Sequence, residues 1–281
     1  MKLLRVGPKG AERPALLDPT GILRDLSGHI DDIAGEALSD AGLAQLRALD
    51  PATLPAVPEG TRIGPCVGQI GKLCCVGLNY TDHAAETGHP IPEEPILFGK
   101  AVTSVSGPND DIETPRGSDA LDYEIEIAIV IGKRAKNVSQ ADALDYVAGY
   151  AVFNDVSERT FQAKRGGQWI KGKSHDSFGP LGPWLVTRDE VADAGNLAMF
   201  LDVNGERRQT GNTATMIFSI PMIVSYISQF MTLNPGDVIP TGTPPGVALG
   251  MKPPKFLQPG DVIDLGIEGL GTQRQTVLPE N

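Results

Sequence analysis

The sequence is poor in cysteine, in aromatic residues and in positive charge. Its three cysteines, Cys66, Cys74 and Cys75, form no CxxC spacing, which excludes a disulfide framework and a zinc site built on paired cysteines. Aromatic residues make up 5% of the 281 positions, too few for base-stacking platforms. The 24 Lys and Arg residues face 35 Asp and Glu residues, and the net charge of −11 disfavours phosphate backbones and anionic lipid. We therefore expect neither nucleic acid nor a membrane as a partner.

Long apolar runs are also missing. The most apolar stretch, residues 216–233, is interrupted by Pro221 and by several Ser and Gln residues, so it is typical of a buried amphipathic helix and not of a membrane span. The N-terminal residues return to charge too soon to form a signal-peptide core, and we expect a cytoplasmic protein. Four apolar residues of the stretch recur at helical spacing and are expected to pack in the core: Ile220, Ile223, Ile227 and Phe230.

Glycine and proline, in contrast, are abundant, with 33 and 23 residues, which favours many short strands joined by shaped loops. The Pro-rich residues 51–60 and the pair Gly64-Pro65 predict a boundary between a small α/β domain over 1–70 and a larger domain over 71–281. The expected fold class is α+β. The patterns predict strands over 2–6, 13–17, 73–77, 121–132, 146–154, 184–187, 198–203, 237–240 and 261–267, and helices over 38–49, 156–164 and 216–230.

Acidic residues occupy one face of the clearest predicted strand, residues 121–132. Successive side chains of a strand point to opposite faces, so Glu124 and Glu126 share a face with Ala128 and Val130. Asp155 follows the next predicted strand and can join them if the two strands pair. Three carboxylates without His or Cys favour Mg²⁺, Mn²⁺ or Ca²⁺ over Zn²⁺. A solvated strand face explains the same pattern, and the residues alone leave both interpretations open.

A histidine and a glutamate follow the predicted strand 73–77. Thr81 or Asp82 can cap a short helix that Gly88 ends, and His83 and Glu86 then lie on one face at positions i and i+3. A carboxylate bonded to one ring nitrogen fixes the tautomer and raises the basicity of the other nitrogen. The pair can serve as a general base that activates water, although an exposed ion pair on a short helix has the same spacing.

Residues 167–174 match the pattern GxxxxGK[ST] of a phosphate-binding loop. That loop requires a buried strand before it and a helix after it. The preceding residues have a helical pattern, and Gly179-Pro180 prevents a helix from continuing after them. We interpret the match as accidental, and Lys173 remains of interest as a cation near the acidic residues.

Five segments, in this order along the chain, resemble the fumarylacetoacetate hydrolase family. The likeness runs from about residue 73 to residue 277. Its segments are Gly77–His83, Asp122–Glu126, Asn154–Arg159, Gly172–Asp176 and Pro235–Val247.

The resemblance implies a role for each matching position. The divalent-metal ligands are Glu124, Glu126 and Asp155, with Mg²⁺ or Mn²⁺ as the cofactor. The pair that activates water on a mobile lid helix is His83 and Glu86, and Lys173 lies beside the metal. The substrate-binding residues are Arg159, Gln162, Gly242 and Thr243. One departure is Ala248, which follows Val247 where many relatives have glycine.

The resemblance also implies a mixed β-sheet roll with a variable N-terminal domain, a homodimer and a small-molecule substrate. The expected activity is metal-dependent hydrolysis of a carbon–carbon bond in a 2,4-dioxo acid, either a 2,4-diketo-3-deoxy sugar acid or an acylpyruvate, to pyruvate and a carboxylic acid such as lactate. Alternatives are oxaloacetate decarboxylation or a ureidoglycolate lyase-type reaction at the same site, a nucleotide-binding enzyme that uses residues 167–174, and a metal-binding or scaffold protein without catalysis.

Overall fold

Two β-sheets form most of the structure. The computed structural model describes residues 1–88 and 90–280. The larger sheet has the strand order β15-β9-β10-β12-β1-β2-β3, and β6 pairs with β12 off this path. Its strands are β1 (Lys2–Val6), β2 (Arg13–Leu17), β3 (Leu23–Asp25), β6 (Val105–Ser106), β9 (Ile125–Ile131), β10 (Val147–Asn154), β12 (Gly179–Thr187) and β15 (Val238–Pro240).

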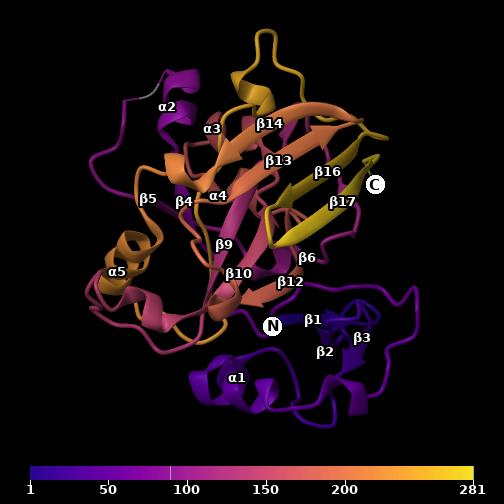
Figure 1. Cartoon of the computed structure of the whole chain (residues 1–281). Helices are drawn as coiled ribbons and strands as arrows, with labels where there is room; N and C mark the ends of the chain where they lie inside the picture. The colour runs from indigo at the N-terminus through magenta and orange to yellow at the C-terminus, as the bar shows by residue number, and fades with distance from the viewer. Residues whose placement is uncertain (89, 281) are drawn as a thin grey trace.

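The second sheet has the order β14-β13-β16-β17-β7 and lies at the upper right of β9 and β10 in Figure 1. Its strands are β7 (Ile112–Glu113), β13 (Ala198–Val203), β14 (Glu206–Asn212), β16 (Val262–Ile267) and β17 (Gly271–Leu278). Two short pairs, β4–β5 and β8–β11, complete the strands, with β4 (Cys74–Gly77), β5 (Ile96–Gly99), β8 (Leu121–Asp122) and β11 (Ser157–Glu158).

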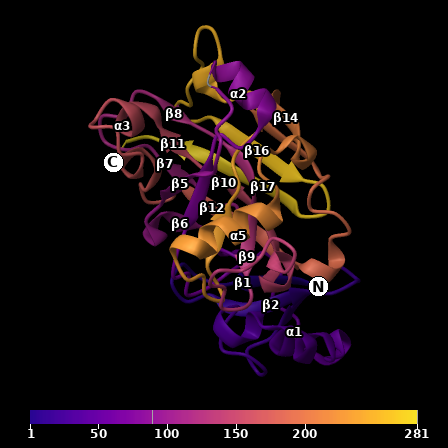
Figure 2. The ribbon, with the colours of Figure 1, turned by 90° about the vertical axis from the view of Figure 1, so that its left-hand side faces the viewer.

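The α-helices are short and lie around these sheets (Figures 1 and 2). They are α1 (Asp40–Arg47), α2 (Thr81–Thr87), α3 (Arg159–Ala163), α4 (Ile170–Lys173) and α5 (Ile220–Phe230). Among the residues that the structure describes, no helix combines the length and the hydropathy that crossing a membrane requires. The many strands and few helices confirm the predicted α+β class.

Strand β9 is buried on both faces and contributes side chains to two apolar clusters. Its isoleucines, from Ile125 to Ile131, pack in one apolar cluster with α5 and the second sheet. Ala128 and Val130 point the other way, into a cluster that includes Leu3, Leu38 and other N-terminal residues. The face that carries the predicted metal ligands is therefore covered, as the alternation in the sequence indicates.

The N-terminal strands continue the larger sheet. β1 pairs antiparallel with β12, with Leu3 opposite Leu185, and β2 and β3 follow outward from β1. In Figure 1 this indigo segment lies below the rest of the chain. The domain boundary near residue 70 stays a prediction.

Several predicted elements differ from the structure. The strand predicted over 121–132 is interrupted after Asp122, because Asp122 pairs with Ser157 of β11 whereas β9 pairs with β10. The helix predicted over 156–164 is α3, which begins only after β11 and is capped by the Glu158 carboxylate. The strands β14 and β17 were not predicted.

The prediction that Phe230 packs in the core is wrong. Phe230 is the last residue of α5, its side chain is 60% exposed, and its ring stacks edge-on against Tyr226 with the centroids 4.9 Å apart. The buried stripe of α5 ends at Ile227 and Ser228, so the periodic pattern of the sequence extends one position beyond it.

The close approach of β10 and β12 predicts a large effect of one methyl group. A Cβ at Gly149 would lie 2.1 Å from the backbone oxygen of Val186. We expect Gly149→Ala to lower the free energy of unfolding by about 1–3 kcal/mol or more, measured by chemical denaturation. Gly28→Ala, at a position where a Cβ meets nothing within 4 Å, is the matched control and should change it by about 0.5 kcal/mol or less. Equal losses in both variants would contradict this packing.

Candidate active site

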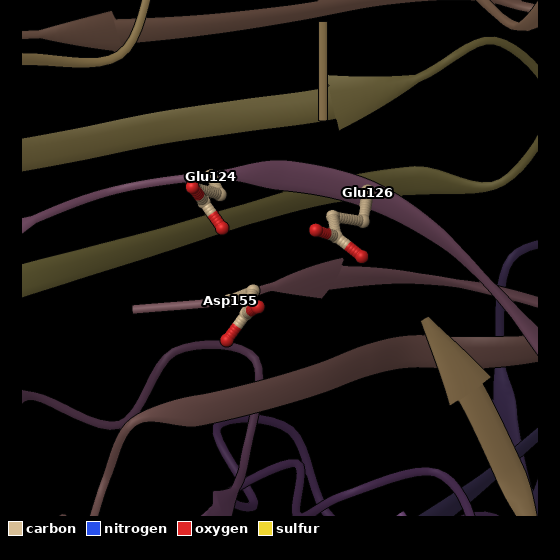
Figure 3. A group of neighbouring side chains, drawn as sticks. All are labelled: Glu124, Glu126 and Asp155. Carbon is tan, nitrogen blue, oxygen red and sulfur yellow. The ribbon is translucent and has the colours of Figure 1, made fainter. Parts of the chain in front are cut away.

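The antiparallel pairing of β9 and β10 brings three carboxylates together. Glu126 lies opposite Phe153, and the backbone N–H of Asp155 donates to the oxygen of Glu124 at 2.8 Å. Glu126, Phe153 and Asp155 thus share a face, since side chains two residues apart point the same way. Each of the three acidic residues has a carboxylate oxygen within 4.8 Å of the others, and all three are buried (Figure 3). The predicted cluster therefore exists, and its role as a metal site stays a prediction.

Three cationic side chains pair with this cluster. The Lys173 ammonium donates to Glu124 at 2.6 Å and to Asp155 at 2.8 Å. Lys100 donates to the other oxygen of Asp155 and to the carbonyl of Val156. Arg159 bridges the start of β9, with Nη2 2.6 Å from Glu124 and Nε 2.8 Å from Asp122. Burial raises the pKa of Glu124, but the charges of Arg159 and Lys173 outweigh it and hold that pKa well below its ordinary value.

Glu126 is the exception. Among residues 1–88 and 90–280, it has no Lys or Arg partner, and Gly242 donates a backbone N–H to it at 2.9 Å. Burial and the negative charges of Asp155 and Glu124 raise its pKa well above the ordinary value. Four carboxylates, with Asp122 included, thus face three cations. One negative charge is therefore not balanced by a cationic side chain. The all-oxygen donor set fits a hard divalent cation such as Mg²⁺ or Mn²⁺.

The His83 and Glu86 pair forms as predicted. Both lie on α2, with Nδ1 of His83 3.1 Å from Oε2 of Glu86. The Glu86 carboxylate also accepts the Gly246 N–H. Burial raises the pKa of Glu86, but the hydrogen bonds from His83 and Gly246 outweigh it and lower that pKa, so Glu86 is ionised. Nδ1 of His83, which faces the ionised carboxylate, therefore carries the proton. Gly88, at a φ of 70°, ends the helix as predicted. The predicted cap is wrong, because Tyr80 occupies that position and Thr81 is already helical.

These groups surround one cavity of about 470 Å³. All the predicted site residues line it except Glu86, which lies behind His83, and Asp155, which is fully buried: the lining members are His83, Glu124, Glu126, Arg159, Gln162, Lys173, Gly242 and Thr243. Phe98 and Trp169 add an apolar wall, with ring centroids 5.2 Å apart. Residues that are distant in the sequence therefore meet at one place.

The polar groups of Gly242 and Thr243 are already engaged within the protein. Gly242 donates its N–H to Glu126, while the Thr243 hydroxyl donates to the carbonyl of Ile125 and accepts from Gln209. Gly242 has a φ of 96°, and a Cβ there would lie 2.8 Å from that of Asn79. The loop thus orients Glu126 and closes the cavity, and direct contact of Thr243 with a substrate stays a prediction.

Sequence reasoning missed Lys100 and gave Asp122 no role. Lys100 follows the apolar run Ile96–Gly99, whose strand β5 is only half-buried, so the sequence carries no local signal that this lysine is buried. Asp122 begins the segment that carries Glu124, but its partners Arg159, Ala248 and Leu249 are distant in the sequence.

The segment 167–174 does not have the geometry of a phosphate loop. The element before it is α3, and α4 lies inside it. Its Lys173 points to Glu124 and Asp155, and thus toward carboxylates. This placement disfavours the nucleotide-binding alternative.

Comparisons with known proteins cover the fold and most of the chain. Residues 72–278 match the family described as "Fumarylacetoacetate (FAA) hydrolase C-terminal". A Burkholderia cenocepacia protein named "Putative hydrolase" is 60% identical over 276 residues, which are 98% of each chain. The structure of a maleylpyruvate hydrolase from Sphingobium sp. SYK-6, in complex with manganese(II) and pyruvate, aligns over 100% of both chains with a TM-score of 0.83 and 28% identity. The structure of a 5-carboxymethyl-2-hydroxymuconate delta-isomerase from Mycobacterium smegmatis also aligns over 100% of both chains, with a TM-score of 0.80 and 33% identity.

The raised pKa of Glu126 predicts a pH dependence of stability in the cation-free protein. Above about pH 4.5, the ordinary value for this carboxyl group, the folded state binds more protons than the unfolded state. The free energy of unfolding therefore falls as the pH rises toward the folded-state pKa. Glu126→Gln removes the charge and keeps an acceptor for Gly242. We expect this variant to be more stable than the natural chain at neutral pH in EDTA, measured by chemical denaturation.

The same variant should lose stabilisation by Mn²⁺. Mn²⁺ at a hundred times its Kd should stabilise the natural chain by about 2.7 kcal/mol and Glu126→Gln by almost nothing. Glu36→Gln, an exposed carboxyl in the N-terminal segment, is the control and should behave as the natural chain does. A Glu126→Gln variant that is less stable in EDTA and still responds to Mn²⁺ would contradict the assignment.

Proposed function

The chain belongs to the fumarylacetoacetate hydrolase family, and from this premise we propose that it is a divalent-cation-dependent hydrolase of 2,4-dioxo acids. The reaction cleaves the bond between C3 and C4 and yields pyruvate and a carboxylic acid, with an acylpyruvate or a 2,4-diketo-3-deoxy sugar acid as the substrate. The cofactor is Mg²⁺ or Mn²⁺, held by Glu124, Glu126 and Asp155.

One observation carries this proposal: a buried carboxylate, Glu126, that has no cationic partner among the described residues lines the same cavity as a carboxylate-bound histidine, His83. Glu126 supplies the negative charge that a dication requires, and His83 supplies a base. A scaffold protein needs neither feature. The manganese and pyruvate in the maleylpyruvate hydrolase structure support the same cofactor class and product for this chain.

Glu124, Glu126 and Asp155 would hold the dication, which would supply Lewis acidity for the reaction. Nε2 of His83 takes a proton from water, while Glu86 holds the proton on Nδ1 and orients the ring. The water oxygen adds to the C4 carbonyl carbon. The C3–C4 bond then breaks with its electron pair on C3, and the proton taken by His83 returns to C3, which gives pyruvate and the acid.

We assign two side chains as donors to the oxygen that becomes negative at C4. Lys173 uses two of its three N–H groups on Glu124 and Asp155, which leaves one for the cavity. The Gln162 carbonyl accepts from Arg159 at 3.1 Å, so its amide N–H groups are available. One such donor is typically worth about 10²–10³ in kcat.

Isomerisation is the second candidate, because the delta-isomerase structure has the same fold at 33% identity. Isomerisation and oxaloacetate decarboxylation both proceed without an attacking water. The Glu86-held His83 favours hydrolysis over decarboxylation, which needs no base, whereas isomerisation can use the same base. The cytoplasmic location and the homodimer stay predictions.

A pyruvate-release screen over acylpyruvates, 2,4-diketo-3-deoxy sugar acids and oxaloacetate, with and without chelator, tests the proposal. In H₂¹⁸O the acid product should gain one ¹⁸O atom from the attacking water. We expect turnover of a dioxo acid that EDTA abolishes and Mg²⁺ or Mn²⁺ restores. Turnover of oxaloacetate alone, or isomerisation without cleavage, would contradict hydrolysis.

The proposed base has its own test. His83→Ala should lower kcat by about 10²–10⁴-fold and leave the Mn²⁺ affinity within twofold, because His83 is not a ligand. His29→Ala, at an exposed N-terminal position, is the matched control and should change neither quantity. Full turnover by His83→Ala would show that another group activates the water.

A further inference from the structure

Asp122 lies outside the groups assigned above, yet it is fully buried and both its oxygens are engaged. One oxygen accepts the backbone N–H groups of Tyr123 at 2.9 Å and Ala248 at 2.8 Å. The other accepts the N–H of Leu249 at 3.1 Å and Nε of Arg159 at 2.8 Å. One carboxylate thus joins strand β8, the loop over residues 246–250 and the arginine of α3.

The loop 246–250 also contacts α2. Both carboxylate oxygens of Glu86 lie within hydrogen-bond distance of the Gly246 N–H, at 3.0 and 3.1 Å. The Tyr123 hydroxyl donates to the Gly246 carbonyl at 3.2 Å. At the other end of the loop, a Cβ on Gly250 would lie 2.8 Å from the carboxyl carbon of Glu86. Glu86 is therefore fitted against the loop that Asp122 and Tyr123 fix to the strand.

On its far side, Asp122 controls a side chain that touches the carboxylate cluster. Arg159 donates Nε to Asp122 and Nη2 to Glu124 at 2.6 Å. With Nε fixed by Asp122, the planar guanidinium has one orientation left, and this orientation sets the position of the Glu124 carboxylate. Hydrogen bonds at both ends and the loop backbone between Gly246 and Leu249 thus connect Glu86 through Asp122 and Arg159 to Glu124.

We propose that Asp122 is a positioning residue that couples Glu86 on α2 to Glu124 in the carboxylate cluster. The proposal rests on the proposed function in one respect, that Glu124 is a metal ligand. A residue that orients a ligand in this way typically contributes about 10- to 100-fold to metal affinity. Glu86 then influences metal binding without touching the metal, and only while Asp122 holds the loop and Arg159 together.

Asparagine at position 122 should break the connection at low steric cost. The amide group has the shape of the carboxylate, but its NH₂ would face either Arg159 Nε and Leu249 N–H or the N–H groups of Tyr123 and Ala248. Two donors would then oppose each other inside the protein, and the loop or the arginine must move.

Mn²⁺ binding to the full-length chain, followed by electron paramagnetic resonance and calorimetry, tests the coupling in a double-mutant cycle. We expect Asp122→Asn to weaken Mn²⁺ binding about 10- to 100-fold. Glu86→Ala should weaken it about three- to tenfold in the natural background and less than twofold in the Asp122→Asn background. Unchanged Mn²⁺ affinity in Asp122→Asn, or an equal effect of Glu86→Ala in both backgrounds, would overturn the proposal.

Asp18 provides the matched control. It is also buried, and its carboxylate accepts the N–H groups of Thr20 and Ile22 and, at 2.8 Å, Nε of Arg24, in the N-terminal β2–β3 segment. Asp18→Asn should lower the free energy of unfolding as Asp122→Asn does and leave the Mn²⁺ affinity and the Glu86→Ala effect unchanged. A similar loss of Mn²⁺ affinity in Asp18→Asn would reduce the role of Asp122 to general stability and overturn the proposal.

Two further arms keep the outcome decisive. If Asp122→Asn does not fold, Tyr123→Phe serves in its place, because it removes only the hydroxyl that donates to Gly246. Tyr123→Phe should make the effect of Glu86→Ala on Mn²⁺ binding smaller. An undiminished effect would overturn the proposal. The Mn²⁺ readout needs no turnover, so a coupled cycle in a chain that hydrolyses no dioxo acid supports the positioning role and rejects only the proposed function. A natural chain that binds no Mn²⁺ overturns the positioning role.

Discussion

Four buried carboxylates share three cationic side chains beneath one cavity. Moving a charge from water into a protein interior costs several kcal/mol, and a partner recovers this only when the geometry is good. Arg159, Lys100 and Lys173 supply such geometry to Asp122, Asp155 and Glu124. Glu126 receives only a backbone N–H from Gly242 among the described residues. Its charge must therefore be cancelled by a proton or by a bound cation, and the chemistry of the cavity depends on which of the two is present.

The fold makes this arrangement unavoidable. Strand β9 is covered on both faces, and its pairing with β10 places Asp155 beside Glu124 with no freedom to separate. A carboxylate on an exposed strand would turn toward water and lose its interaction with its neighbour. Here the side chains have no exposed direction except the cavity, so the repulsion between Glu126 and its neighbours is relieved only by a proton or by a bound cation.

The sequence predicted the parts of the site that follow from local periodicity. Alternation along 121–132 placed Glu124 and Glu126 on one face, and helical spacing placed His83 beside Glu86. Periodicity does not reveal pairing over long separations, so Lys100 and the bonds of Asp122 to Ala248 and Leu249 were not predictable from the residues. Local patterns also fail at the ends of elements. Phe230 continues the apolar stripe of α5 but is exposed. Residues 123–124 lie between β8, which pairs with β11, and β9, which pairs with β10.

The folding free energy lost by burying four carboxylates indicates that the cluster has a role other than stability. Well-packed apolar side chains of similar volume often stabilise a protein as much as a buried ionic network does, so stability alone does not explain four carboxylates in this place. A buried carboxylate without a partner makes the folded state less stable, and a cation that binds only the folded state reverses that loss by mass action. Folding stability and cation affinity are then linked through Glu126. Because Lys173 also contacts two of the three acidic residues, a cation bound by all three would share Glu124 and Asp155 with this ammonium. Four carboxylates, three cationic side chains and a dication would then sum to a net charge of +1.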